Sequence, residues 1–405
     1  MPNISKQDSP GFKVWNRFNK DILAMIGFWI IGIAILMAIL GYWICPDHSP
    51  NANLMHIEYS IKKPGSSFSL LLIRKKKKID TVSFLKRGWS GQVPFFEEIP
   101  INHYRIFGDS IQVNTYTGVS TDSLEKSTFH LVYVAFALDG KIEKKADTYF
   151  FKDIYGRNLS IQRADLIKQI EQKNLIHRTY ILGTDRYGRD LLSRLILGSR
   201  ISISVGIMAV FISLFLGILL GSLAGFFRGW VDQCISWLIN VVWSLPALLL
   251  VIAISFALGK GLWQVFVAVG LTMWVEVARM VRGQIFIMRE VEFVEAGKAL
   301  GMNNFRIITK HILPNIAGPI LVVASSNFAS AILLEAGLSF LGYGAQPPFP
   351  SWGSMIRENY GYIMVDAAFL ALIPGLAIML IVYGFNLWSI GLRDAYDIRD
   401  QNTMV

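Results

Sequence analysis

The residues that could carry out chemistry are few and widely spaced. The sequence contains no Gly-x4-Gly-Lys-Ser/Thr phosphate loop, no Gly-x-Ser-x-Gly nucleophile turn, no His-Glu-x-x-His motif and no EF-hand loop. The six histidines are scattered, and the two cysteines, Cys45 and Cys234, are too far apart in sequence to form a Cys-x-x-Cys site. We therefore predict no catalytic residue, no metal site and no cofactor bound by this chain.

One segment has the composition of a binding element. Residues 282–315 connect two apolar stretches, and a helix-favouring run within them ends at Gly301. A second amphipathic helix follows, with Phe305 and Ile308 on its apolar face, and we expect Pro314 to stop it. Two short helices with small residues make a knob that a partner's groove could grip; the alternative is a helix lying among lipid headgroups. The residues of interest are Glu295, Ala296, Gly297, Ala299, Leu300, Gly301, Leu313 and Pro314.

A second candidate site lies inside an apolar stretch. Glu335 is a carboxylate among apolar residues, where charge is costly and usually faces a cavity or a partner group. At 100° per residue, Ser330 and Glu335 lie within about 80° of the direction of Asn327. This stripe could face a cavity, or Glu335 could bond to a neighbouring helix.

The elements that position these residues belong to a membrane protein. Hydrophobic residues make up 53% of the 405 residues and charged residues 17%, whereas soluble domains have about 25% charged residues. A bilayer core needs about 20 apolar residues. The run Ile22–Ile44 has no charge and ends in Tyr42-Trp43-Ile44, which resembles an aromatic interface anchor. The predicted spans are 22–44, 201–226, 237–258, 262–281, 316–341 and 364–388.

The positive charges predict the orientation of these spans. With the N-terminus inside, the short inner segments hold 12 lysine and arginine residues, and the short outer ones hold only Lys260 and Arg357. Positive residues collect on the cytoplasmic side, so we place both termini there, with residues 1–21 and 396–405 as cytoplasmic segments. The longest inner connection is then 282–315.

The segment 45–180 has a different character. It contains turn residues, strand-like runs at 68–73, 104–107, 111–116 and 129–136, and an amphipathic helical pattern at 159–175. We predict an α+β extracytoplasmic domain inserted between the first two spans. Its run of four lysines, Lys75–Lys78, is a solvated loop or a site for an anionic partner.

Four groups of residues resemble one family. Glu295-Ala296-Gly297-x3-Gly301 with Leu313-Pro314 is similar to the EAA loop of binding-protein-dependent ABC importer permeases, with Gly297 in place of the usual alanine and His311 in place of an apolar residue. Three further blocks resemble the C-type subunit of the dipeptide, oligopeptide and nickel branch: Gly183–Asp190, Trp243–Pro246, and Leu338–Gly344 followed by Pro347, Pro348, Pro350, Ser351, Trp352 and Gly353. The last six residues resemble an outer loop at the pore mouth.

The resemblance implies an all-α permease of the type I ABC importer fold with six transmembrane helices and a core at 181–395. It implies a non-enzymatic subunit in a bacterial inner membrane, which forms half of the path for peptides. We assign five residues to this transport path: Asn327, Ser330, Glu335, Trp243 and Pro246. The stripe that holds the first three would suit an amino terminus. The implied partners are a B-type permease subunit, two ATPase subunits that bind ATP and magnesium, and an external binding protein; no nucleic acid is implied.

Several alternatives stay open. The cargo could be nickel or another small solute, and the protein could instead be a secondary carrier or a membrane-anchored receptor. The family usually has a shorter segment where residues 45–180 stand. That insertion could touch the binding protein, cover the pore mouth, or form a surface domain without a transport role.

Overall fold

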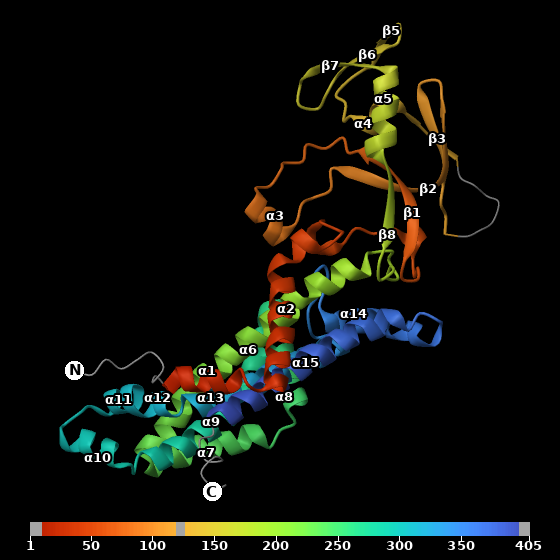
Figure 1. Cartoon of the computed structure of the whole chain (residues 1–405). Helices are drawn as coiled ribbons and strands as arrows, with labels where there is room; N and C mark the ends of the chain where they lie inside the picture. Colours follow the sequence, from red (N-terminus) through yellow and green to blue (C-terminus); the bar gives the residue numbers. More distant parts are fainter. Residues whose placement is uncertain (1–9, 119–125, 397–405) are drawn as a thin grey trace. The chain divides into compact units, whose positions relative to one another are not determined.

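The computed structural model describes residues 10–118 and 126–396 (Figure 1). The chain forms two compact units, which we describe separately. The helical unit comprises Met1–Ile39, Gly198–Ile363 and Ala368–Val405. The mixed unit comprises Leu40–Leu197 and Met364–Ala367.

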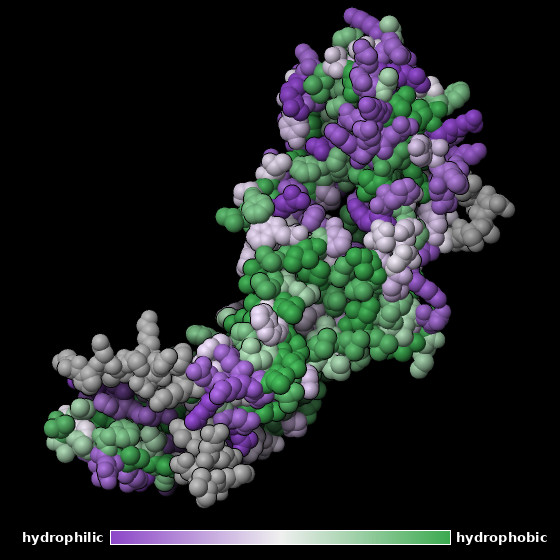
Figure 2. Space-filling model, viewed as in Figure 1, coloured by the Kyte–Doolittle hydropathy of each residue, from purple (hydrophilic) through white to green (hydrophobic). Residues whose placement is uncertain are grey.

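Five helices in the described residues are long and apolar enough to cross a membrane. They are α2 (Ile22–Ile44), α6 (Leu191–Phe227), α9 (Leu262–Met288), α13 (Ala317–Leu341) and α15 (Phe369–Tyr396). A sixth crossing requires the pair α7 (Gly229–Trp243) and α8 (Ala247–Leu258), which bend by 94° at their junction. Much of the visible surface over the long helices is apolar (Figure 2), as expected of surfaces that meet lipid or other subunits.

Three helix boundaries differ from the sequence-based prediction. The run 237–258 is not one continuous helix: α7 ends at Trp243, and Pro246 precedes α8 because proline cannot donate to the preceding turn. The helix α6 begins ten residues before the predicted position 201, because Arg194 and Arg200 lower the hydropathy without ending the helix. At the other end of the chain, α15 covers Phe369–Tyr396 rather than 364–388.

The helices α6 and α9 approach each other along three glycines. A Cβ atom on Gly221 would lie 2.6 Å from the carbonyl oxygen of Ala278, and one on Gly225 would lie 2.8 Å from that of Arg282. At Gly217 the nearest atom would be Cβ of Val277, at 2.4 Å. Small residues at every fourth position let two helix backbones come close inside a membrane.

Shorter helices complete this part of the chain. They are α1 (Pro10–Phe18), α10 (Glu292–Ala299), α11 (Asn304–Ile307), the π-helical turn η5 (Ile308–Ile312), α12 (Leu313–Asn315), α14 (Trp352–Asn359) and the turn η6 (Tyr360–Met364). Pro314 does not stop the second loop helix, contrary to expectation. It lies at the start of α12, where a missing N–H costs little.

The mixed unit contains two antiparallel sheets. Its larger sheet has the strand order β4-β3-β2-β1-β8 and its smaller sheet the order β5-β6-β7. The strands are β1 (Ser66–Arg74), β2 (Phe96–Phe107), β3 (Ser110–Thr115), β4 (Lys126–His130), β5 (Glu143–Lys145), β6 (Thr148–Lys152), β7 (Asn158–Gln162) and β8 (Leu175–Tyr180). The helices are α3 (Phe84–Ser90), α4 (Leu131–Ala135) and α5 (Arg163–Gln169), with the turns η2 (Pro50–Ala52), η3 (Ile57–Tyr59) and η4 (Ile170–Asn174).

Two predictions inside this unit are wrong in part. Residues 129–136 are not one strand, because His130 ends β4 and its imidazole accepts a hydrogen bond from the N–H of Val132 at the start of α4. Burial of Leu131 and Val134 in the core outweighs their preference for strands. The helix predicted at 159–175 begins only at Arg163, since the preceding residues pair with β6.

The close contact between α6 and α9 can be tested at Gly221. We expect Gly221→Val to destabilise the protein by about 1–3 kcal/mol, because the new methyl groups overlap the α9 backbone. The matched control is Gly283→Val on α9, where a Cβ atom meets no atom within 4 Å. Thermal unfolding of both purified variants measures the difference, and equal melting temperatures would contradict this packing.

Candidate functional site

The helix α10 is closed by a regular glycine cap. Gly301 has a φ of 73°, its N–H bonds to the carbonyl of Lys298 (2.9 Å), and the N–H of Met302 bonds to that of Gly297 (3.0 Å). This pair of bonds is the Schellman motif, which needs a left-handed residue and therefore favours glycine. The chain turns sharply here and enters α11.

One face of α10 is buried. Val294 is 1% exposed, and the α-carbon of Gly297 faces Met302 and Ile307. These residues join a cluster of buried side chains from α6, α9, α11 and η5: Phe226, Val277, Val281, Ile285, Val294, Ile307, Ile308, Ile312 and Ile316. The loop is therefore packed onto the ends of two long helices.

The opposite face of α10 is open. Of the residues predicted from the loop motif, Glu295, Ala296, Ala299, Leu300, Gly301 and Pro314 are exposed, Leu313 is half-buried and Gly297 is buried. Leu300 and Phe305 are 77% and 73% exposed. Sequence reasoning placed Phe305 on the buried face with Ile308; only the packing of η5 separates them. We define the exposed residues from Glu295 to Gly301, with Phe305, as the knob.

Two arginines attach the segment that precedes α10 to the long helices. The guanidinium of Arg289 donates to the carbonyl of Phe226 at the end of α6 (2.6 Å). Arg228, between α6 and α7, donates to Glu290 (2.7 Å) and lies 4.0 Å from the ring centre of Phe286. These contacts attach the segment before α10 to the ends of α6 and α9.

Glu335 is buried among hydroxyl groups. It is 1% exposed, and it accepts hydrogen bonds from Ser202 of α6 (3.2 Å) and Ser339 (2.7 Å). Ser351 also donates to Ser339 (3.3 Å) and caps α14. These bonds join α6, α13 and the loop before α14, which favours the structural role over direct contact with a cargo.

Asn327 lies in a different environment. It is fully buried, yet neither its amide nitrogen nor its oxygen has a hydrogen-bond partner among the described residues. It lines a groove of about 340 Å³ between α9, α13 and α15, together with Glu276, Ser326 and Arg393. An unpartnered amide beside one acidic and one basic side chain suits a ligand with polar groups of both signs. Ser330, in contrast, is exposed and is not among the residues that line this groove.

The other predicted site residues occupy separate places. Trp243 is exposed at the end of α7 and lies beneath the guanidinium of Arg279, 3.1 Å from its ring centre; Pro246 is exposed at the start of α8. Pro347 and Pro348 are exposed, whereas the other four outer-loop residues, Pro350, Ser351, Trp352 and Gly353, are buried. A Cβ atom on Gly353 would lie 2.7 Å from the carbonyl of Ala336, so this loop sits on α13.

The block Gly183–Asp190 has a structural part in the mixed unit. Asp185 is 1% exposed and accepts hydrogen bonds from the N–H groups of Tyr187 and Arg189 and from the Arg189 guanidinium (2.7 Å). The α-carbon of Gly188 packs against the backbone of His56. Asp190 accepts from the N–H of Ser193 and so caps the start of α6.

A buried ion cluster joins β2 to β8. Glu98 accepts two bonds from the guanidinium of Arg178 (2.6 and 2.7 Å) and contacts His56 (2.9 Å). Burial alone would raise the pKa of Glu98, but the bonds from His56 and Arg178 outweigh it and hold the pKa below its usual value of 4.5. The cluster stabilises the sheet across β1.

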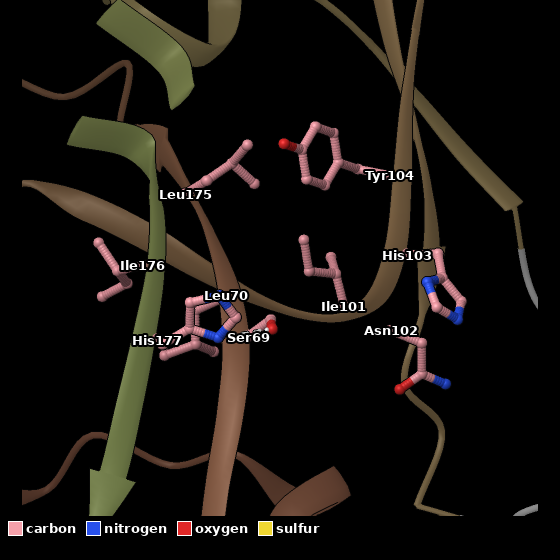
Figure 3. A pocket seen from close by; sticks show the side chains of 9 residues that line it. All are labelled: Ser69, Leu70, Ile101, Asn102, His103, Tyr104, Leu175, Ile176 and His177. Carbon is pink, nitrogen blue, oxygen red and sulfur yellow. Dashed lines mark hydrogen bonds between the residues drawn. The ribbon is translucent and has the colours of Figure 1, made fainter. Parts of the chain in front are cut away.

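Two further pockets lie on this sheet. Figure 3 shows one of about 220 Å³, in which His177 lies beside Ser69 (3.0 Å) and His103 lies apart from both. The other, about 940 Å³, is lined by Arg74, Lys75–Lys77, Phe129 and Tyr133 among others, so the lysine run borders an open groove. No group of three metal-binding side chains occurs in the part of the chain that the structure describes.

Comparisons with known proteins identify related chains. Residues 217–397 match the binding-protein-dependent transport system inner membrane component, and residues 9–59 match the N-terminal transmembrane domain of oligopeptide transport permease C. A dipeptide transport system permease protein of Alkalihalophilus pseudofirmus is 44% identical over 53% of this chain and 70% of its own length. A glutathione transport system permease protein of Pectobacterium atrosepticum is 41% identical over 53% and 71%.

One solved structure is also similar in part. An inward-facing MetNI methionine ABC transporter aligns with a TM-score of 0.43 and 19% identity, over 51% of this chain and 98% of the other. The two family models leave residues 60–216 between them, a range that holds all eight strands.

The two buried polar groups of α13 should respond differently to truncation. Glu335→Ala leaves buried hydroxyls without their acceptor, which costs about 1–3 kcal/mol each, so the melting temperature should fall clearly. Asn327→Ala removes an amide that has no partner among the described residues, and it should change the melting temperature little while uptake falls. If Glu335→Gln abolished uptake without loss of stability, Glu335 would belong to the path instead.

The ion cluster predicts a dependence on pH. Because the folded state lowers the pKa of Glu98, its contribution to stability is complete above 4.5 and disappears as the pH falls below 4.5 through the folded-state pKa. Amide hydrogen exchange at β8, from neutral pH to below 4.5, should show this loss. Glu98→Gln should abolish it, whereas Glu97→Gln, at the exposed neighbouring position, should leave it unchanged.

Proposed function

The chain belongs to the family of binding-protein-dependent inner-membrane permeases of ABC importers, and from this premise we propose that it forms half of a pathway for peptides. The subunit itself is not an enzyme. The knob on α10 carries the proposal, since an exposed element packed onto the ends of two long helices is what a separate ATPase needs in order to move them. We assign the hydrolysis of ATP, with magnesium, to two such partner subunits.

The cargo is proposed from the relatives and from the groove beside Asn327. The two relatives are named for a dipeptide and for glutathione, and both of these cargoes carry an amino group, carboxylates and amides. Glu276 and Arg393 offer one charge of each sign along the groove, and the Asn327 amide offers a donor and an acceptor. An exposed carboxylate within a membrane span faces a cavity or a partner rather than lipid. We propose that this groove is part of the path.

The coupling follows from the packing. When the ATPases close on the knob, α10 moves as a rigid body, because its inner face is locked against Ile307 and the cluster beneath. The Arg289 bond to Phe226 carries this displacement to α6. Small shifts at one packed joint can thus tilt the long helices between inward-facing and outward-facing arrangements.

The arrangement in the membrane is part of the proposal. We count six spans, with α7 and α8 as one bent crossing, and place both termini in the cytoplasm on the distribution of lysine and arginine. The strands of the mixed unit then lie outside as an α+β insertion, and the partners include a B-type permease and an external binding protein. Within the proposed importer fold, Pro347–Gly353 forms the outer loop.

The coupling role of the knob makes a direct prediction. Gly301→Asp and Glu295→Lys should abolish peptide uptake, and also the ATPase stimulation by the peptide-loaded binding protein, while each variant still inserts and co-purifies with the other permease subunit. Glu295→Lys reverses a charge on the surface held by the ATPase and leaves the buried face of α10 intact. Gly301→Asp adds a carboxylate to the same surface and also strains the cap, because residue 301 has a φ of 73°. Proteoliposomes with the complete importer provide both measurements.

The control is Glu143→Lys, an exposed charge reversal on β5, which should keep normal uptake. Normal uptake by both knob variants would contradict a role of the knob in coupling.

A competition experiment in the wild-type importer tests the cargo. Unlabelled dipeptide should displace the labelled dipeptide and nickel should not; if nickel displaced the label and unlabelled dipeptide did not, the cargo would be a metal ion rather than a peptide.

A further inference from the structure

The short helix α3 presents a large apolar surface. Phe84, Leu85 and Trp89 are 72%, 77% and 76% exposed. At 100° per residue these three side chains and Gly88 occupy an arc of about 140°, and Lys86, Arg87 and Ser90 occupy the opposite side. Such a concentration of bulky apolar groups on one turn of a helix marks an interaction surface.

The position of α3 is fixed by the end of α2. The ring of Phe84 stacks on Trp43 with centroids 5.2 Å apart, and a Cβ atom on Gly88 would lie 2.4 Å from the Trp43 ring. Beyond the helix, the α-carbon of Gly91 lies against Tyr42, and the N–H of Gln92 bonds to the carbonyl of His48 (2.9 Å). Contacts at both ends thus attach α3 to residues 42–48.

These residues lie where α2 leaves the membrane. The apolar run of α2 ends in Tyr42-Trp43-Ile44, and tryptophan and tyrosine concentrate at the level of the lipid headgroups. A helix attached to Trp43 is held at the same level. Its exposed apolar arc therefore lies at a level where apolar side chains can enter lipid.

The charges of the segment suit the same environment. Lys86 and Arg87 flank the apolar arc, and the preceding loop contains Lys75–Lys78 with a single carboxylate, Asp80. Amphipathic helices with aromatic and leucine side chains on one face and basic residues on the other lie in the interface, where anionic headgroups attract them.

We propose that α3 is a membrane-surface anchor: its Phe84, Leu85 and Trp89 insert among the lipids beside the end of α2, and Lys86 and Arg87 contact anionic headgroups. The anchor holds the β1–β2 connection of the mixed unit against the bilayer. This role is separate from the transport of cargo and does not depend on which solute the importer carries.

Depth-dependent quenching tests the proposal on the full-length chain in nanodiscs of phosphatidylcholine and phosphatidylglycerol. Leu85→Cys, in a chain with Cys45→Ser and Cys234→Ser, carries the fluorophore NBD. The expected result is a blue-shifted emission, strong quenching by nitroxide-bearing phosphatidylcholine and weak quenching by iodide in the water. Lowering the phosphatidylglycerol content should weaken the nitroxide quenching of the label at position 85. This loss should be larger in the chain that keeps Lys86 and Arg87 than in the chain with Lys86→Gln and Arg87→Gln.

The matched control is a label on Phe107→Cys. Phe107 is 81% exposed and is the last residue of β2. It lies about 36 Å along the strand from Phe96, the first residue of β2, which comes soon after α3 in the chain. This label should be quenched by iodide and not by the lipid nitroxide. Because both variants replace exposed side chains of one unit, the comparison holds the fold constant.

Three outcomes would overturn the proposal. Iodide quenching at position 85 as strong as at 107 would show that the surface faces water. Shielding at 85 that develops only when the binding protein is added would identify a protein-docking surface. Shielding that requires two copies of the chain per nanodisc would identify a self-association surface.

Discussion

The close contact between α6 and α9 is possible because Gly217, Gly221 and Gly225 carry no side chains, so that the two backbones meet almost directly. The ends of both helices then lie side by side, and Phe226, Val281 and Ile285 form one apolar surface. The inner face of α10 packs against this surface through Val294.

The two faces of α10 differ in their surroundings. Val294 on its inner face packs into the buried apolar cluster of α6, α9 and η5, whereas Leu300 and Phe305 of the knob are exposed. α11 packs beneath α10, where a Cβ atom on Gly297 would make ordinary contacts with Met302 (3.5 Å) and Ile307 (3.9 Å), and the capped turn at Gly301 sets the angle between the two helices. The packing of the apolar cluster and the polar contacts of Arg228 and Arg289 together hold the loop in place.

Two buried polar groups of α13 differ in whether their hydrogen bonds are satisfied. Glu335 is satisfied by Ser202 and Ser339, which ties three segments together. Asn327 is equally buried and lacks partners in the described chain, so its desolvation is uncompensated unless a ligand or water supplies them. The mixed unit repeats the first pattern, since the buried carboxylate of Glu98 bonds to the Arg178 guanidinium and to the His56 imidazole.

The sequence by itself determined the class of the molecule, the family and the position of the loop that carries the knob, because these depend on local composition and short motifs. The apolar run Ile22–Ile44 coincides with α2, since a helix that must hide its backbone from lipid ends where the apolar run ends. Only the tertiary structure decided which side of each helix is buried. Periodicity gave Phe305 and Ile308 the same face, and Ser330 and Glu335 a shared stripe, yet packing separated both pairs. It also decided the helix at Leu131, where long-range contacts outweigh local preference, because the free energy of burying a side chain depends on neighbours that are distant in the sequence.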